Sequence, residues 1–323
     1  MKKTVPVSTV AATRDHGGGL DAARARFGGR TEDWIDLSTG INPHAYPLPP
    51  FALTDWTRLP DQNAVAVLET TARRFWAVPD AAAVLPVPGL SAAIARIPAL
   101  VPAARVRIAQ PTYNEYAAAF SQAGWRIAER GAADAVVLVH PNNPTGAYHG
   151  PNDGGPADLY IIDESFCDLS PDKSLIAMSS NPGTIVLKSF GKFWGLAGLR
   201  LGFAIGDPVL LATLSQLLGP WAVSGPALRA GDAALSDPNW ATSARTRLAE
   251  EAEQLDTLAS HAGALLSGGT SLFRLYEFAS AKDVYDRLAH ARILCRIFPY
   301  SDTWVRLGIP PDAEAWARLE RAL

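Results

Sequence analysis

The sequence predicts an α/β fold built around a mostly parallel sheet that helices cover on both faces. Short, nearly continuous apolar runs alternate with helical segments through the middle of the chain. Runs of this kind are typical of parallel strands, which are buried on both faces. We expect strands at residues 106–109, 135–139, 159–162, 185–187 and 201–205.

Helical segments separate and follow these strands. We expect them at residues 64–76, 91–100, 115–123 and 208–218. A longer helix at about residues 239–262 is rich in Ala, Glu, Arg and Leu and ends near Gly263. This helix indicates the entry to a smaller C-terminal domain, so we expect a large domain at 36–225 and a small one at 226–323.

Composition narrows the possible functions. The chain has 323 residues, of which 48% are hydrophobic and 19% charged, which is ordinary for a globular protein. The net charge of -3 offers no basic excess for nucleic acid. No apolar run approaches the roughly 20 residues of a membrane span. Cys167 and Cys295 are too few for a disulfide framework or a zinc site, so we expect a cytoplasmic protein without a metal.

Polar residues follow three of the expected strands. Asn143, Asp163 and Lys192 each stand at or just beyond the carboxyl end of a strand, where ligands bind in open α/β sheets. Each also has a simpler interpretation. Asn-Pro-Thr-Gly forms turns by itself, an Asp at a strand end is often a helix cap, and a lone Lys is usually solvated. Their shared placement favours a common site.

The segment Ser189-Phe-Gly-Lys-Phe-Trp-Gly-Leu-Ala-Gly-Leu-Arg-Leu-Gly202 resembles the fold-type I pyridoxal-phosphate enzymes, the aspartate-aminotransferase superfamily. The resemblance implies that Lys192 is the catalytic lysine and binds pyridoxal 5'-phosphate covalently. It also implies that Ser189 and Arg200 bind the cofactor phosphate, for which a bidentate guanidinium is well suited.

The same resemblance extends to residues earlier in the chain. Asp163 corresponds to the carboxylate that pairs with the pyridinium nitrogen, and Asn143 to the residue that hydrogen-bonds the phenolic oxygen. Tyr113 corresponds to the aromatic side chain that stacks on the cofactor ring. Gly89, Leu90 and Ser91 open a helix and are expected to offer backbone N–H groups to the phosphate.

The resemblance covers roughly residues 30–310 and also implies how the chain folds. It implies a seven-stranded sheet between helices in the large domain, and a smaller α+β domain built from both termini. Residues 1–35 are then expected to pack beside the small domain. The resemblance also implies a homodimer with the active site near its interface.

The sequence departs from the superfamily pattern at three places. Phe166 stands where many relatives carry a tyrosine that donates to the phenolic oxygen. Leu59 stands where many carry a tyrosine that reaches the partner subunit's phosphate. The stretch between Gly146 and Asp163 is short. These departures leave the cofactor-binding set intact but suggest an altered balance of reaction outcomes.

Segments near both ends of the chain indicate which subfamily of these enzymes the sequence resembles. The glycine-rich segment 15–19, the segment 36–43 and the C-terminal segments around Arg296 and Arg306 resemble threonine-phosphate decarboxylases of cobalamin biosynthesis, with histidinol-phosphate aminotransferases as near relatives. This implies that His16 lies near a substrate phosphate, that Asn42 lines the site, and that the two arginines hold the substrate carboxylate. Alternatively, His16 is a loop histidine, Asn42 a turn residue and Arg296 a surface residue.

Three hypotheses about function stay open. The first is decarboxylation of L-threonine O-3-phosphate, a small phosphorylated amino acid, and the second is transamination of histidinol phosphate or a related amine. The third is a non-catalytic cofactor-binding or scaffold protein, which the presence of Lys192, Asp163 and Arg200 disfavours. A nicotinamide dehydrogenase is disfavoured because no Gly-x-Gly-x-x-Gly follows the first strand.

Overall fold

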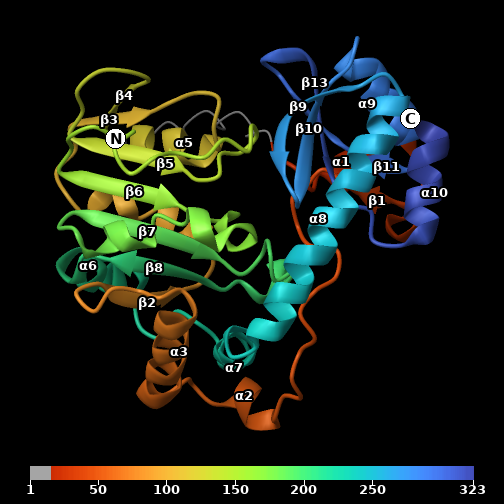
Figure 1. Ribbon diagram of the computed structural model, residues 1–323. Coiled ribbons are helices and arrows are strands. Elements are labelled where there is room, and N and C mark those ends of the chain that lie inside the picture. Colours follow the sequence, from red (N-terminus) through yellow and green to blue (C-terminus); the bar gives the residue numbers. More distant parts are fainter. Residues whose placement is uncertain (1–15) are drawn as a thin grey trace, which may run out of the picture.

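The computed structural model describes residues 16–323 and contains two bodies, which are connected by a long helix at residues 238–261 and by the chain segment 37–52 (Figure 1). The larger body holds a seven-stranded sheet in the order β2-β8-β7-β6-β5-β3-β4. Its strands are β2 (Ala83–Val87), β3 (Arg105–Ile108), β4 (Arg126–Ala128), β5 (Ala135–Val139), β6 (Leu159–Asp163), β7 (Thr184–Ser189) and β8 (Gly202–Gly206).

The sheet confirms the α/β prediction and refines it. Strands β3 to β7 pair in parallel, whereas β8 runs antiparallel to both of its neighbours, β7 and β2. The strand expected at residues 201–205 is therefore the antiparallel member of the sheet. Strands β2 and β4 were not predicted, because β2 contains a proline and β4 is short and mostly exposed.

Helices cover both faces of this sheet. One face carries α4 (Leu90–Ile94), α5 (Asn114–Gln122) and α6 (Pro208–Leu218), and the other carries α3 (Gln62–Phe75), α7 (Gly225–Leu235) and α8 (Pro238–His261). A strand covered on both faces points successive side chains to opposite faces of the sheet, and β8 does so. Ala204 belongs to the core under α4 to α6, and Phe203 and Ile205 belong to the opposite core.

The expected helix at residues 91–100 is interrupted. Helix α4 ends at Ile94, and a 3-10 turn, η2 (Ile97–Ala99), follows it. Pro98 explains the break, because its ring would clash with the carbonyl of Ile94 and it has no N–H to donate. The long helix α8 and helix α6 lie within one residue of their predicted bounds.

The smaller body contains a four-stranded antiparallel sheet and a two-stranded parallel one. The sheet orders are β12-β13-β10-β9 and β1-β11. Its elements are α1 (Leu20–Phe27), β1 (Ile35–Asp36), β9 (Leu265–Thr270), β10 (Phe273–Glu277), α9 (Ala281–His290), β11 (Ile293–Leu294), β12 (Arg296–Phe298), β13 (Ser301–Gly308) and α10 (Ala313–Ala322). The remaining short elements are α2 (Leu53–Thr57), η1 (Thr31–Asp33), η3 (Cys167–Leu169), η4 (Pro171–Lys173), η5 (Ile176–Ser180) and η6 (Ala197–Leu199).

Residues 16–36 lie beside the C-terminal elements, and Figure 1 shows α1 and β1 within the smaller body. Strand β1 pairs with β11, and Ala23 and Trp34 pack with Ala289 and Leu294 in one core. The first fifteen residues of the expected N-terminal segment lie outside the described part. Helix α7, which the boundary at 225/226 assigns to the small domain, packs against α2 and α3. Among residues 16–323, no helix is both long and apolar enough to cross a membrane.

A buried ionic group lies at the carboxyl side of the sheet, on β7 and just after β6. The ammonium of Lys188 lies 2.5 Å from Glu164 and 3.7 Å from Asp168, and all three side chains are almost fully buried. Burial by itself would lower the pKa of Lys188, but the two carboxylates outweigh it and raise that pKa. Asp168 also accepts hydrogen bonds from the indoles of Trp76 at 2.8 Å and Trp194 at 3.2 Å. We call Lys188, Glu164 and Asp168 the Lys188 cluster.

The Lys188 cluster predicts a large stability effect. Lys188→Ala leaves two buried carboxylates without their cation, and the expected loss is about 3–5 kcal/mol of unfolding free energy. Chemical denaturation monitored by tryptophan fluorescence measures it. Lys173→Ala is the matched control, because its ion pair with Asp172 is exposed and such pairs contribute about 0–1 kcal/mol. Equal effects of the two substitutions would contradict the prediction.

Candidate active site

A cavity opens at the carboxyl ends of β5, β6 and β7. In the sheet register, Val139 pairs with Asp163 and Asp163 with Leu187, so the three strands end at nearly the same level. The residues that follow them therefore meet at one edge. The cavity is lined by Leu90, Ser91, Ile94, Tyr113, Val139, Asn143, Asp163, Ser165, Phe166, Ser189, Gly191, Lys192, Ala197 and Arg200. We call it the cofactor cavity.

Lys192 presents its amine to this cavity, with protein around the rest of the side chain. Desolvation is the largest cause of its altered titration, and the positive charge of Arg306 adds to it. Together they lower the pKa of Lys192 to about 8, although Asp163 and Asp36 act in the opposite direction. The ammonium also lies 5.6 Å from the ring centroid of Phe166. A lysine with such a pKa can both lose and hold a proton near neutral pH, as a nucleophile and proton carrier must.

Asp163 is buried and accepts three hydrogen bonds at the end of β6. Its Oδ1 accepts from the backbone N–H of Ser165 at 2.9 Å and from the Ser165 hydroxyl at 2.5 Å. Its Oδ2 accepts from the hydroxyl of Tyr116 at 2.7 Å. Burial raises the pKa of Asp163, and these donors and the charge of Lys192 partly offset that rise. The site thus holds a carboxylate facing a ring-sized cavity, suited to a protonated ring nitrogen.

Tyr116 and Ser165 were not predicted as part of the site, although the sequence carries a signal for each. Ser165 stands two residues after Asp163, the spacing at which an Asp side chain bonds the backbone of a turn. Tyr116 lies in the first turn of α5, three residues after Tyr113, which is the residue immediately before that helix. Their ring centroids lie 6.2 Å apart. Burial and the neighbouring Asp163 raise the pKa of Tyr116, which keeps its hydroxyl a donor.

The guanidinium of Arg200 lies close to Gly89, which immediately precedes α4. A Cβ at position 89 would lie 2.6 Å from Nη2 of Arg200, so a side chain there would clash with the guanidinium. Gly89 also has a φ of 78°, which disfavours other residues. The opening N–H groups of α4 have no intrahelical acceptor. Together with the Ser189 hydroxyl at the end of β7, they fit a phosphate group.

Asn143 connects the cofactor cavity to the smaller body. Its side-chain oxygen accepts a hydrogen bond from Nη1 of Arg306 on β13. This contact orients the amide, because the oxygen must face the guanidinium. The NH2 group then remains as the donor toward the cavity, which is the group that a phenolic oxygen requires. Arg306 donates in addition from Nη2 to the carbonyl of Ser38 at 2.7 Å.

A second cavity adjoins the first and shares Tyr113 and Asn143 with it. Its lining residues are His16, Gly17, Gln110, Thr112, Tyr113, Asn114, Asn143, Pro144, Arg296, Phe298, Pro299, Tyr300 and Arg306. We call it the substrate cavity. It brings together three of the four residues that the sequence predicted for substrate binding, namely His16, Arg296 and Arg306.

The two arginines of the substrate cavity stand directly opposite each other on antiparallel strands. Arg296 on β12 pairs with Arg306 on β13. Like charges in such a position repel, so the pair favours an anion between or beside them. Burial and the charge of Arg296 lower the pKa of Arg306 to about 10, so it remains protonated at neutral pH. His16 contributes a further polar group and lies 2.8 Å from Glu115.

Asn42 lies apart from both cavities. Its side-chain NH2 donates to the carbonyl of Phe193 at 2.8 Å, and its backbone N–H donates to the carbonyl of Lys192 at 3.0 Å. Its side-chain oxygen accepts from the backbone of His44 at 3.0 Å. These contacts make Asn42 a clamp on the segment that carries Lys192. Asn42 is in the lining of neither cavity, and its predicted contact with the substrate stays a prediction.

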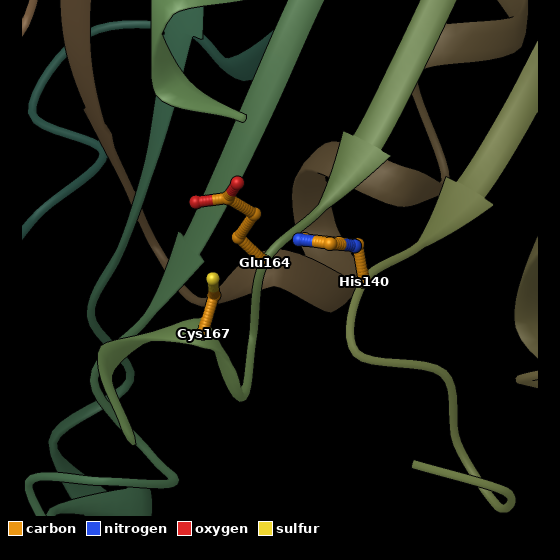
Figure 2. A group of neighbouring side chains, drawn as sticks. All are labelled: His140, Glu164 and Cys167. Carbon is orange, nitrogen blue, oxygen red and sulfur yellow. The ribbon is translucent and has the colours of Figure 1, made fainter. Parts of the chain in front are cut away.

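A further group of side chains has the composition of a metal site. His140, Glu164 and Cys167 converge from the ends of β5 and β6, and their ligand atoms lie within 4.8 Å of one another (Figure 2). Nδ1 of His140 accepts from the backbone of His149 at 2.9 Å, and Nε2 donates to the carbonyl of Lys173 at 2.7 Å.

These bonds use both ring nitrogens of His140, so the ring has no lone pair to offer. Glu164 is already paired with the ammonium of Lys188 and bonded to Ser174 at 2.7 Å. The group is therefore a hydrogen-bonded part of the core rather than a set of free metal ligands.

Comparison with known proteins places the chain among enzymes of related sequence. The model of the family described as "Aminotransferase class I and II" matches residues 126–321. A threonine-phosphate decarboxylase of a Sinorhizobium species is 42% identical over 95% of this chain and 97% of its own length. A protein of the same name from Pseudomonas aeruginosa is 39% identical over 96% and 97%.

Solved structures of low sequence identity share the fold. A histidinol-phosphate aminotransferase from Sinorhizobium meliloti, in complex with pyridoxal-5'-phosphate, superposes with a TM-score of 0.80 at 20% identity, over 94% of this chain and 93% of the other. An L-threonine-O-3-phosphate decarboxylase from Porphyromonas gingivalis gives 0.71 at 19% identity, over 88% and 96%.

The pKa of Lys192 predicts a pH dependence. When pyridoxal phosphate is added to the cofactor-free protein, the rate of covalent attachment should rise with pH and be half-maximal near pH 8, because only the neutral amine is a nucleophile. Stopped-flow absorbance from pH 6 to 10 measures it. Arg306→Ala removes a cation that lowers this pKa, so its midpoint should move upward. A wild-type midpoint near 10 would contradict the prediction, and Lys282→Ala is the control.

Proposed function

This chain belongs to the class I and II aminotransferase family, and from that membership we propose that it is a pyridoxal-phosphate-dependent decarboxylase of L-threonine O-3-phosphate. The product is (R)-1-amino-2-propanol O-2-phosphate, formed together with carbon dioxide. The reaction is proposed to serve cobalamin biosynthesis.

One observation carries the choice of reaction. The threonine-phosphate decarboxylases match at 42% and 39% identity over 95% and 96% of the chain. An aromatic amino acid aminotransferase from Mycobacterium avium matches at 31% over 56% of the chain. Because the substrate cavity is built from residues near both ends of the chain, a match of nearly full length bears on the substrate more than one that covers about half of the chain.

The geometry of the two cavities supports this reaction. Pyridoxal phosphate supplies an electron sink for the electron pair released when a bond at Cα breaks. Arg296 and Arg306 can hold the substrate carboxylate with two planar sets of donors, which fixes its direction better than one set. The direction matters because the bond that breaks must lie perpendicular to the cofactor ring. His16 is available to the phosphate at the same cavity.

Lys192 completes the reaction as the proton donor. When carbon dioxide leaves Cα, that carbon must gain a proton to become the CH2 group of the product. The pKa of about 8 lets Lys192 carry a proton at neutral pH and release it to a stronger base. Phe166, packed beside this ammonium and against Phe273 at 5.0 Å, adds no competing hydroxyl there.

Product analysis tests the proposal. Incubation with O-phospho-L-threonine should yield carbon dioxide and aminopropanol phosphate in equal amounts, with little pyridoxamine phosphate. Arg306→Ala should lose about 2–5 kcal/mol of transition-state stabilisation, a fall of about thirtyfold or more in kcat/KM. Arg296→Ala should also slow decarboxylation.

Arg318→Ala removes an arginine on α10 that lines neither cavity, so its kcat/KM should equal that of the unaltered protein. Robust formation of pyridoxamine phosphate without carbon dioxide would instead establish the aminotransferase alternative.

The proposed assembly is a homodimer in the cytoplasm. Large apolar side chains lie exposed on and near α2: Leu53 is 76% exposed, Trp56 66%, Leu59 65% and Trp221 60%. Exposed apolar groups in such number are typical of an interface. Light scattering should give about twice the 34.4 kDa chain mass, and Trp56→Glu should shift it toward the monomer. A particle of single-chain mass at micromolar concentration would refute the dimer.

A further inference from the structure

Ser38 joins the glycine-rich N-terminal segment to Arg306. Its side chain is buried, and its hydroxyl oxygen accepts a hydrogen bond from the backbone N–H of Gly18 at 2.7 Å. The same hydroxyl donates to Oδ1 of Asp36 at 2.5 Å, which the backbone N–H of Ser38 also reaches at 2.9 Å. The carbonyl of Ser38 accepts from Nη2 of Arg306 at 2.7 Å. One residue therefore contacts both segments that carry the anion-binding side chains.

The backbone on either side of Ser38 is held to the smaller body. The N–H of Leu37 donates to the carbonyl of Leu294 at 2.8 Å, and the N–H of Gly308 donates to the carbonyl of Leu37 at 2.7 Å. These bonds tie Ser38 to β11 and to the end of β13, two residues beyond Arg306. Its position relative to that arginine is thus fixed by backbone contacts.

The segment that carries His16 lies directly on Ser38. A Cβ at position 17 would approach the Ser38 carbonyl to 2.5 Å, so only glycine permits this contact. Gly18 adopts a φ of 83°, which brings its N–H to the Ser38 hydroxyl. With Gly17 and Gly18 docked in this way, His16 lines the substrate cavity together with Arg306.

We infer that Ser38 is a positioning residue that sets the separation between His16 and Arg306, and thereby selects amino acids that carry a phosphate at one particular distance from the carboxylate. The inference rests on the proposed function. Ser38 lines neither cavity, so it acts through the two side chains that it positions and not on the substrate itself.

Ser38→Ala separates the contact of Ser38 with Gly18 from its contact with Arg306. It removes the acceptor for the Gly18 N–H and one of two donors to Asp36, which keeps its bond from the backbone N–H of Ser38, and it leaves the carbonyl that holds Arg306. The KM for O-phospho-L-threonine should rise about tenfold, the effect of one lost hydrogen bond, with kcat nearly unchanged. The dissociation constant of unphosphorylated L-threonine, followed by cofactor absorbance, should stay the same because that ligand has no phosphate. An equal loss of affinity for both ligands would overturn the inference.

A double-mutant cycle distinguishes positioning from a general loss of structure. If Ser38 acts through His16, the variant Ser38→Ala/His16→Ala should have the same KM as His16→Ala alone. Multiplicative effects would overturn the inference. Ser179→Ala is the matched control, since Ser179 is equally buried at 1% exposure and its hydroxyl has no hydrogen-bond partner among residues 16–323. Its KM should equal that of the unaltered protein.

Hydrogen exchange tests the contact without any substrate. In the unliganded holoenzyme, the amides of residues 16–19 should exchange about tenfold faster in Ser38→Ala, because the Gly18 N–H loses its acceptor. Unchanged exchange would overturn the inference. This result is independent of turnover: absence of carbon dioxide with the unaltered enzyme would refute the proposed function, while the exchange rates would still report on Ser38.

Discussion

The parallel register of β5, β6 and β7 is the constraint on which the site depends. Because these three strands end at the same level, the residues that follow them share one cavity. Asn143, Asp163 and Lys192 are far apart in the chain, yet each needs only its strand to reach this edge. The antiparallel strand β8 then returns the chain alongside β7. The connection between them carries Lys192 and Arg200 past the same cavity.

Charged residues of both bodies act on the pKa of Lys192. Asp163 from the larger body and Asp36 from the smaller one favour the protonated form of Lys192, whereas burial and Arg306 oppose it. Both aspartates are held in the same way, since each accepts from the backbone and the hydroxyl of a serine two residues later. This local arrangement fixes the direction of two carboxylates near one amine. The resulting pKa of about 8 suits a residue that must act as nucleophile and as acid.

The segment that carries Lys192 is held from both sides. On the side of the Lys188 cluster, the indole N–H of Trp194 donates to Asp168. The Trp194 ring stacks on the rings of Phe190 and Trp240, with centroids 5.2 Å apart in each pair. From the N-terminal side, Asn42 bonds the carbonyls of Phe193 and Lys192. The loop that carries the lysine is therefore anchored by hydrogen bonds and ring packing on both sides. Such support is required where a reactive group must stay within a fraction of an ångström of its target.

The sequence by itself determined the α/β class and most strand positions, and it predicted the cofactor-binding residues by resemblance, because those signals are local. One segment of the chain is enough to show that Asp163 ends a strand. The same holds for the spacing of Ser189, Lys192 and Arg200. Only the tertiary structure decided the roles of residues whose partners lie far away. Tyr116 bonds Asp163 across 47 positions, Asn42 bonds Phe193 across 151, and Ser38 bonds Arg306 across 268. Asn42 carries no local mark that separates a clamp from a cavity lining, because its side chain can serve either role and only the packing of the two bodies selects one.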